Sequence, residues 1–87
     1  MQLAVNTAPL SWQRAAQLLS RYSIGSTSLY RRVEEGLLPP PVRIGPNTSA
    51  WPQHELDVID RARLAGADDA KIRGLVQQLV IARKEAA

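Results

Sequence analysis

The chain has 87 residues, a formal net charge of +3 at pH 7 and no cysteine. Its length allows one small domain with an appendage, and the absence of cysteine excludes disulfide bonds and thiolate metal sites. No apolar run approaches the roughly 18 residues that a membrane-spanning helix needs, and the opening MQLAVNTAPL lacks the pattern of a secretory signal. We therefore expect a cytoplasmic protein with no membrane partner.

The excess positive charge lies in the first part of the chain. Residues 1–51 carry five arginines against two glutamates, whereas residues 52–87 carry six cations against six carboxylates. Arginine forms planar, bidentate contacts with phosphate and guanine that lysine does not form. The placement of the charge therefore favours nucleic acid as a partner of the first part.

A first helix is expected soon after the N-terminus. Residues 1–10 show no clear period and are expected to form a loose arm, and Ser11 then resembles an N-cap for the stretch WQRAAQLL. The apolar residues of one helical face in this stretch are Trp12, Ala15, Ala16 and Leu19. We expect Trp12, together with Trp51 farther along the chain, to lie in the core. Gly25 marks the turn that follows.

A second helix is expected over residues 26–35, capped at its start by Ser26 or Thr27. Gly36 follows at the position where a left-handed C-cap belongs. The apolar residues of this helix lie one turn apart, and Arg31 falls on the opposite face. The pattern predicts a helix with one buried face and one basic, polar face. The two apolar residues are Leu29 and Val33.

An extended segment follows, because the three prolines at positions 39–41 cannot continue a helix. Residues 42–44 then alternate apolar, arginine and apolar, as in a half-buried strand. Residues 45–48, GPNT, have turn chemistry, and residues 49–51 can return as a second short strand. The sequence therefore predicts a small β-hairpin directly after a helix.

Two further helices are expected in the rest of the chain. Pro52 fits the first position of a third helix, QHELDVIDRARLA, which ends near Gly66, and Asp68 caps a fourth. The fourth helix has the strongest amphipathic pattern in the chain, with an apolar stripe of Ile72, Leu75, Val76, Leu79 and Val80. We expect this stripe to join neighbouring copies of the chain. The alternatives are packing against the third helix and binding to a different protein.

Two short helices joined by a turn, followed by a two-stranded hairpin, occur in the order of a winged helix-turn-helix. We therefore predict a mainly α fold with a small β-hairpin wing over residues 11–66, and a C-terminal amphipathic helix over residues 67–87. The second helix of such a unit enters the major groove of DNA with its N-terminal residues against the base edges. Small hydroxyl residues and helix N–H groups at that end allow phosphate to approach closely.

A set of spaced residues also carries a family resemblance. The set consists of STSLYR at residues 26–31, Val33, Gly36, Pro39, PVRIG at residues 41–45, Ala50, Trp51 and Glu55. With this spacing, residues 11–64 resemble the small phage regulators of the AlpA type, which are related to excisionases and more distantly to MerR-like DNA-binding domains. The turn before Gly25 is slightly longer than the usual pattern, and the tail after Gly66 goes beyond the shortest members.

The resemblance implies a winged helix-turn-helix that binds double-stranded DNA. Members of the family either regulate transcription or act as recombination directionality factors of mobile genetic elements. On this interpretation the protein partners would be an integrase or recombinase, or RNA polymerase. The competing hypothesis is a protein-interaction adaptor or antitoxin-like module that acts through the C-terminal helix.

The candidate DNA contacts lie on the second helix and on the wing. They are Ser26, Thr27, Ser28, Tyr30, Arg31, Arg32, Arg43, Asn47 and Thr48. Two alternatives stay open at this point: the adjacent arginines can pair with Glu34 and Glu35 on a solvated face, and Tyr30 can belong to the core. We predict no catalytic residue, no metal site and no cofactor, because the single histidine, His54, has no cysteine or second histidine to share a metal.

Overall fold

The computed structural model describes residues 10–85, so the arm expected at residues 1–10 lies almost wholly outside the described residues. These residues form a mainly helical domain with four helices and a small three-stranded antiparallel sheet. In chain order the elements are β1 (Trp12–Gln13), α1 (Ala15–Tyr22), α2 (Ser26–Glu34), β2 (Val42–Gly45), β3 (Thr48–Pro52), α3 (Gln53–Leu64) and α4 (Asp69–Glu85). None of the helices in this range is long and apolar enough to cross a membrane.

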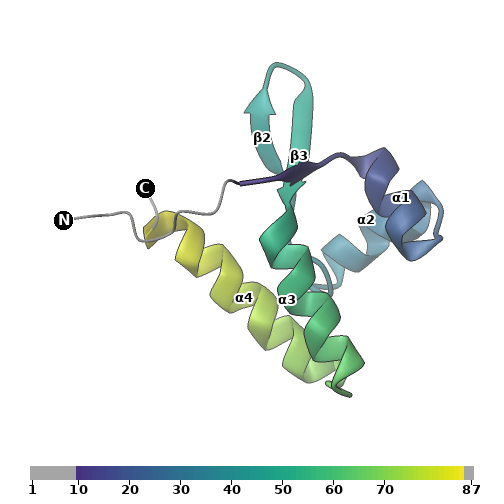
Figure 1. The fold of residues 1–87 in the computed structure, drawn as a ribbon, viewed down its shortest axis with the longest axis vertical. Helices are drawn as coiled ribbons and strands as arrows, with labels where there is room; N and C mark the ends of the chain where they lie inside the picture. Colours follow the sequence, from purple (N-terminus) through teal and green to yellow (C-terminus); the bar gives the residue numbers. More distant parts are fainter. Residues whose placement is uncertain (1–9, 86–87) are drawn as a thin grey trace.

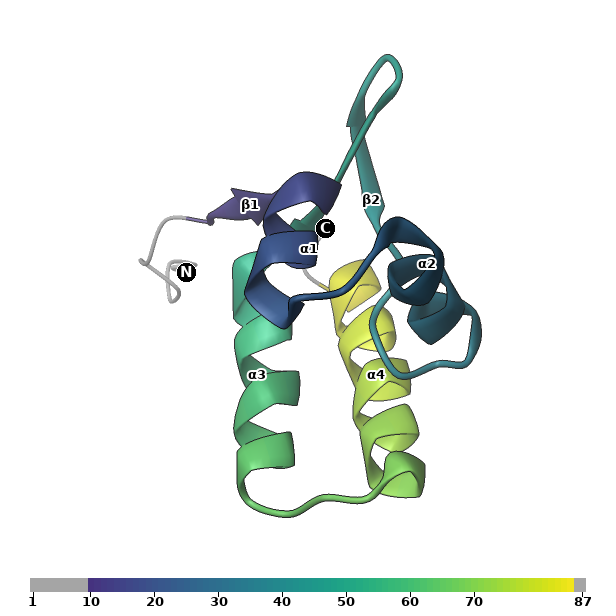
Figure 2. The ribbon, with the colours of Figure 1, turned by 90° about the vertical axis from the view of Figure 1, so that its right-hand side faces the viewer.

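The helices gather below a hairpin that projects from one end of the molecule (Figure 1). This hairpin is formed by β2 and β3, and β3 is the central strand of the sheet because β1 pairs with its other edge. Helices α3 and α4 lie side by side in both views, and α1 and α2 stand beside the base of the hairpin (Figures 1 and 2). The sheet and the first two helices therefore share one end of the domain.

The chain enters this domain as a strand and not as a helix, so the N-cap predicted at Ser11 is wrong. Trp12 and Gln13 pair with the last two residues of β3, and the carbonyl of Ser11 accepts a hydrogen bond of 2.8 Å from the N–H of Gln53. The helix begins three residues later, with Arg14 as its N-cap. The backbone N–H of Arg14 donates to the side-chain oxygen of Gln17 at 2.7 Å. The backbone groups of residues 11–13 thus pair with β3 and the start of α3, so they are not available for the hydrogen bonds of a longer helix.

The later start moves the apolar face of α1 by three residues. Its buried residue is Leu18, and the residues that pack around the core beside it are Ala15, Leu19 and Tyr22. Ala16, which was predicted on this face, is exposed. The side chain of Trp12 is 38% exposed on the edge strand, so its assignment to the core is also wrong.

The predicted ends of the other helices agree with the structure to within a residue or two. Helix α2 has Gly25 as its N-cap instead of Ser26 or Thr27. It ends at Glu34 with Glu35 as its C-cap, and the next residue, Gly36, has a φ of 78°, the left-handed conformation that glycine allows. Pro52 precedes the first residue of α3 instead of occupying it. Asp68 caps α4 as predicted, because its carboxylate accepts the N–H of Lys71 at 2.9 Å. Local capping signals were therefore sufficient for these boundaries.

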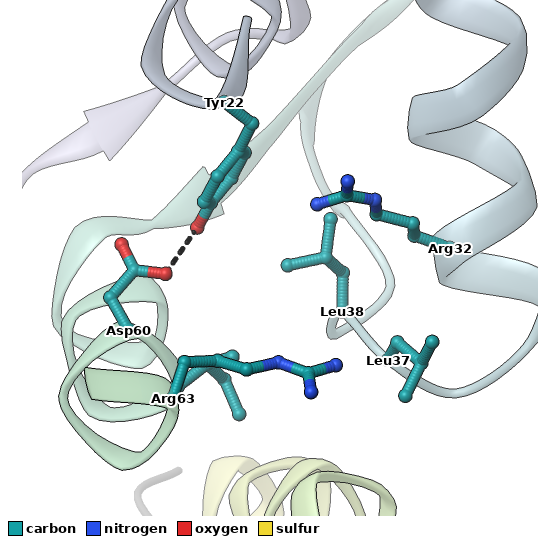
Figure 3. Close-up of a pocket in the computed structure, with 7 residues that line it drawn as sticks. Tyr22, Arg32, Leu37, Leu38, Asp60 and Arg63 are labelled. Carbon is teal, nitrogen blue, oxygen red and sulfur yellow. Dashed lines mark hydrogen bonds between the residues drawn. The ribbon is translucent and has the colours of Figure 1, made fainter. Parts of the chain in front are cut away.

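A polar cluster fastens α1 to α3. The guanidinium of Arg21 donates to Asp57 at 2.9 Å and to Asp60 at 2.6 Å, and the hydroxyl of Tyr22 donates to the other oxygen of Asp60 at 2.9 Å (Figure 3). Burial, followed by the hydrogen bond to Asp60, raises the pKa of Tyr22 above its ordinary value. The phenol is therefore neutral at physiological pH and acts as a fixed donor.

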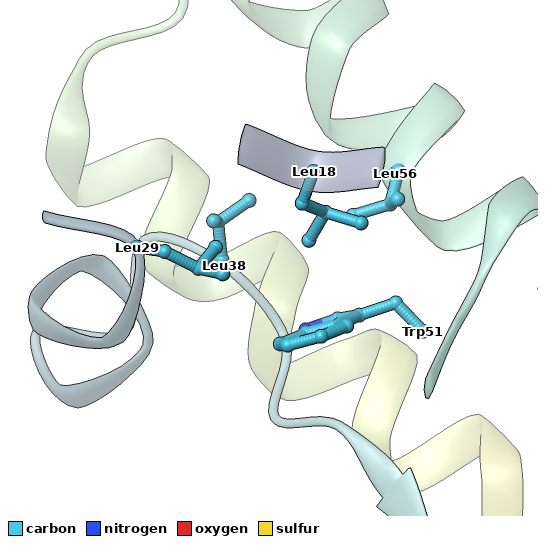
Figure 4. Packing of buried hydrophobic residues seen from close by; sticks show 5 residues of the cluster. All are labelled: Leu18, Leu29, Leu38, Trp51 and Leu56. Carbon is cyan, nitrogen blue, oxygen red and sulfur yellow. The ribbon is translucent and has the colours of Figure 1, made fainter. Parts of the chain in front are cut away.

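The main core lies between the first two helices, the sheet and the start of α3. Five buried residues pack together there, and Trp51 is their largest member (Figure 4). The others are Leu18, Leu29, Leu38 and Leu56. The ring of Trp51 is 1% exposed, which confirms its predicted place in the core, and its indole N–H donates to the carbonyl of Pro39 at 2.7 Å. This bond fixes the direction of the proline segment that leads into the hairpin.

A second apolar cluster joins α4 to α3. Its buried members are Ile59 from α3 and Ile72 and Val76 from α4. The partly buried residues around it are Leu37, Ala62, Ala67, Leu75, Leu79 and Val80. All five residues of the predicted self-association stripe thus pack within a single chain. Ile72 and Val76 are buried, and Leu75, Leu79 and Val80 are partly buried, so the alternative of packing against the third helix describes the single chain. Self-association through the part of this face that is still exposed stays a prediction.

Polar contacts at both ends of α4 complete its attachment to the rest of the domain. Near its start, Arg73 donates to the backbone carbonyl of Glu35 at 2.8 Å. Near its end, Arg83 forms an ion pair of 2.6 Å with Glu55, a carboxylate that is almost fully buried, and donates to the carbonyl of Pro40 at 2.8 Å. Within the segment predicted as an appendage over residues 67–87, the described residues 67–85 therefore pack against residues 11–66.

Candidate nucleic-acid interface

Helix α2 presents a polar face to solvent because its apolar residues point into the core. Leu29 is fully buried, and a residue two positions along a helix points about 200° away from it. Arg31 stands at that position and is exposed, as is Thr27 on the preceding turn. The face predicted from the helical period is therefore the face that the fold leaves open.

Tyr30 connects this face to the hairpin. Its side chain is 50% exposed, and its ring lies 6.4 Å from the ring of Trp51, measured between centroids, with the planes inclined at 46°. Trp51 belongs to β3, so the aromatic contact holds α2 beside the base of the hairpin. Tyr30 thus has an apolar side in contact with the core and an outer edge in solvent, and its contact with DNA stays a prediction.

Among the described residues, no side chain caps the N-terminal end of α2 with a hydrogen bond. The N-cap is Gly25, which has no side chain with which to cap the helix. Ser26 and Thr27 are exposed, and Ser28 is half-buried. The first N–H groups of a helix have no partner within the helix, and they carry the positive end of its dipole. This end therefore offers backbone donors and hydroxyl groups to an anion.

The hairpin carries the second group of predicted contacts. Arg43 is exposed on β2 opposite Ser49, and the register of the two strands shifts between Arg43 and Gly45. Asn47 occupies the turn with a φ of 54° and is exposed. Thr48, which is half-buried, donates its hydroxyl to the carbonyl of Pro46 at 3.0 Å and so stabilises the turn. Arg43 and Asn47 are therefore two exposed polar residues of the hairpin whose side chains can contact a ligand.

The arginines of the domain differ in whether the protein supplies them with acceptors. Four of them donate to carboxylates or backbone carbonyls, and these are Arg21, Arg63, Arg73 and Arg83. Within residues 10–85, Arg31 and Arg43 have neither an ion pair nor a hydrogen bond to a protein group. The alternative in which Arg31 pairs with Glu34 or Glu35 is therefore not seen. Two neighbouring elements each present an arginine with all its donors unused.

Arg14 is a further exposed cation that the sequence analysis missed. It follows Gln13, which pairs with Trp51, so it stands beside the base of the hairpin, and its guanidinium has no partner in the described part of the chain. It was overlooked because a helix starting at Ser11 would have made it an interior helical residue. The signal that was available is Gln17, three residues later, which caps the true start of α1.

Arg32 does not join these residues. It is half-buried on the opposite border of α2 from Tyr30, and the central carbon of its guanidinium lies 5.9 Å from the centroid of the Tyr22 ring. There it lines a groove between α2 and α3, together with residues that include Asp60 and Arg63 (Figure 3). The structure thus separates the two adjacent arginines, with Arg31 on the outer face and Arg32 on the inner side of the helix.

Comparison of the chain with models of protein families, with curated proteins and with solved structures gave no match. Within residues 10–85, no group of three or more histidine, cysteine, aspartate or glutamate residues is arranged to hold a metal ion. The geometry of the exposed arginines and the spacing of the sequence motif are therefore the observations that bear on function.

Proposed function

We propose that this protein binds double-stranded DNA as a winged helix-turn-helix, with α2 as the recognition helix and the β2–β3 hairpin as the wing. The observation that carries the proposal is the pair of unpartnered arginines on neighbouring elements, Arg31 on α2 and Arg43 on β2. An arginine that donates to no protein group can bind phosphate or guanine, because its fork of N–H groups forms two hydrogen bonds with either partner.

Each group has a distinct role in the proposed complex. The N-terminal half of α2 enters the major groove, where Arg31 donates to a base edge. The uncapped backbone N–H groups at the start of the helix and the hydroxyl groups of Ser26 and Thr27 donate to phosphate oxygens. Tyr30 orients its hydroxyl toward the backbone at the border of the groove. On the wing, Arg43 and Asn47 contact a phosphate of the neighbouring segment.

The biological role that suits these contacts is the control of a mobile genetic element, either as an excisionase-type directionality factor or as a transcription regulator. The support is the spaced motif shared with AlpA-type regulators, together with the location of the net charge in residues 1–51. The partner would be an integrase or recombinase in the first role and RNA polymerase in the second. The adaptor hypothesis has less support, because Ile72 and Val76 of α4 are buried in a cluster with Ile59 of α3, whereas Leu75, Leu79 and Val80 are only partly buried.

The test is a nuclease footprint combined with gel-shift titration on the DNA that flanks the gene. We expect a protected site and a preference for that DNA over unrelated sequence of at least about 10³-fold at physiological salt. The double variant Arg31→Ala/Arg43→Ala should lose this preference, whereas the charge-matched variant Arg61→Ala/Lys84→Ala, which alters exposed cations of α3 and α4, should keep it. Equal losses in the two double variants, or no preference in the wild type, would refute the proposal.

A further inference from the structure

A groove opens on the inner side of α2, away from the proposed DNA contacts. It has a volume of about 430 Å³ and lies between α1, α2, α3 and the segment that leads from α2 to the hairpin (Figure 3). The residues that line it are Tyr22, Arg32, Leu37, Leu38, Ile59, Asp60 and Arg63. A volume of this size falls within the range of roughly 300–1,000 Å³ that small-molecule sites occupy.

Two arginines face this groove from opposite walls. Arg32 extends from α2 and Arg63 from α3, and their guanidinium groups approach the same apolar surface (Figure 3). Arg32 lies over the Tyr22 ring and has no carboxylate within 4.0 Å in the described residues. Arg63 pairs with Asp69 at 2.8 Å, but the two side chains are 41% and 55% exposed, so solvent weakens this pair. Both arginines are therefore available to an anion.

The single acid of the groove has both its oxygens engaged by protein donors. One oxygen of Asp60 accepts the hydroxyl of Tyr22, and the other accepts two N–H groups of Arg21 at 2.6 and 2.9 Å. Arg21 also pairs with Asp57 at 2.9 Å, so its one positive charge is shared between two carboxylates. The groups of the groove that can donate to an incoming anion are the guanidinium groups of Arg32 and Arg63.

The floor between the arginines is apolar. Leu38 and Ile59 are 3% and 2% exposed, and Leu37 is half-buried beside them. Burial of further hydrocarbon against these side chains stabilises a complex by about 25 cal/mol for each Å² removed from water. A ligand that fits both features has one anionic end and one hydrocarbon end.

We propose that this groove binds a small amphipathic carboxylate, whose oxygens accept hydrogen bonds from Arg32 and Arg63 and whose hydrocarbon chain lies on Leu37, Leu38 and Ile59. The charge complementarity selects an anion, and the size of the groove selects a small molecule in place of a folded partner. This site is independent of the proposed DNA contacts, so its test is done without DNA.

The test is titration of the protein, labelled with ¹³C at leucine and isoleucine methyl groups, with sodium octanoate. We expect saturable shifts of the methyl signals of Leu37, Leu38 and Ile59. Octanamide, which keeps the chain and lacks the charge, and acetate, which keeps the charge and lacks the chain, should each bind at least about tenfold more weakly. Equal affinity for octanoate and octanamide, or shifts confined to other methyl groups, would overturn the assignment.

Variants locate the carboxylate within the groove. Arg32→Gln and Arg63→Gln should each weaken octanoate binding by about tenfold, since each removes a charge-assisted hydrogen bond. Arg61→Gln alters an exposed arginine two residues away on α3 and should leave the affinity unchanged, and Asp69→Asn should leave it unchanged or increase it, because Arg63 is then released. Urea unfolding of each variant verifies that the fold is kept. If the Arg61 variant loses as much affinity as the Arg63 variant, binding is non-specific and the site does not exist.

Discussion

At the scale of single residues, the most informative side chain is that of Arg31. It is exposed, opposite the buried Leu29, and its donors have no acceptor within the described chain. We predict that Arg31→Ala weakens binding to the specific DNA site by about 1–3 kcal/mol, the range for loss of a bidentate base contact. Fluorescence anisotropy at physiological salt measures this change, with Arg61→Ala as the control. Unchanged affinity in the Arg31 variant would contradict the recognition-helix assignment.

Arg43 should respond differently, because a strand arginine on the wing is expected to meet phosphate. We predict that Arg43→Ala weakens binding to specific and unrelated DNA by similar factors and lowers the slope of log affinity against log salt by about one unit. Titrations at several salt concentrations on both DNAs provide the measurement. A loss confined to the specific site would show that the wing reads bases instead of contacting the backbone.

The two tryptophans give a matched test of the core. Trp51 is 1% exposed and donates to the carbonyl of Pro39, whereas Trp12 is 38% exposed on the edge strand. We predict that Trp51→Ala lowers the free energy of unfolding by about 3–5 kcal/mol. Trp12→Ala should lower it by only about 1 kcal/mol. Urea denaturation followed by far-UV circular dichroism compares them, and equal losses would mean that the two rings share one environment.

At the scale of elements, the attachment of α4 depends on a buried ion pair. Arg83 neutralises Glu55, whose side chain is 2% exposed, and removing one partner of a buried pair leaves a charge without compensation. We predict that Arg83→Ala lowers the free energy of unfolding by about 3–5 kcal/mol. Arg63→Ala, which breaks the exposed pair with Asp69, should cost about 1 kcal/mol or less. Similar urea midpoints for the two variants would show that the Glu55 carboxylate is solvated.

The helices and the hairpin could be predicted from the sequence because their signals are local. Gly36 ends α2 in the left-handed conformation, and Asp68 caps α4 through its own carboxylate. The strand β1 could not be predicted in this way. It has two residues, and its partner, β3, lies about forty residues farther along the chain, so no local period reveals it. The error in β1 then displaced the start of α1 and its apolar face.

The candidate site was predicted less completely, since the direction of a side chain depends on its tertiary neighbours. The helical period placed Arg31 on the outer face of α2 but left Arg32 on a border. The ring of Tyr22, which lies on another helix, decides that Arg32 turns toward the groove. The same limit applies to α4, because an apolar stripe shows that a helix is covered and does not show by which surface.

At the scale of the whole molecule, the exposed arginines of the proposed DNA contacts and the packed helices α3 and α4 lie in different parts of the domain. The sheet, α1 and α2 share one end, where Arg14, Arg31 and Arg43 have no acceptor within residues 10–85, while α3 and α4 pack along the body of the domain (Figures 1 and 2). The extents of 41, 33 and 18 Å describe a thin domain. We propose that this end lies against a duplex, and that Arg61, which is exposed on α3 without an ion pair among the described residues, does not take part.

Chemical-shift mapping tests most directly whether this end of the domain, and no other, contacts DNA as we propose. The ¹⁵N-labelled protein is titrated with the footprinted duplex, and the amide signals of each element are followed to saturation. We predict that the largest changes occur over residues 26–31 of α2 and residues 43–48 of the hairpin, while the exposed Gln77 and Gln78 of α4 keep their positions. Largest changes on α4, with α2 and the hairpin unaltered, would contradict the account.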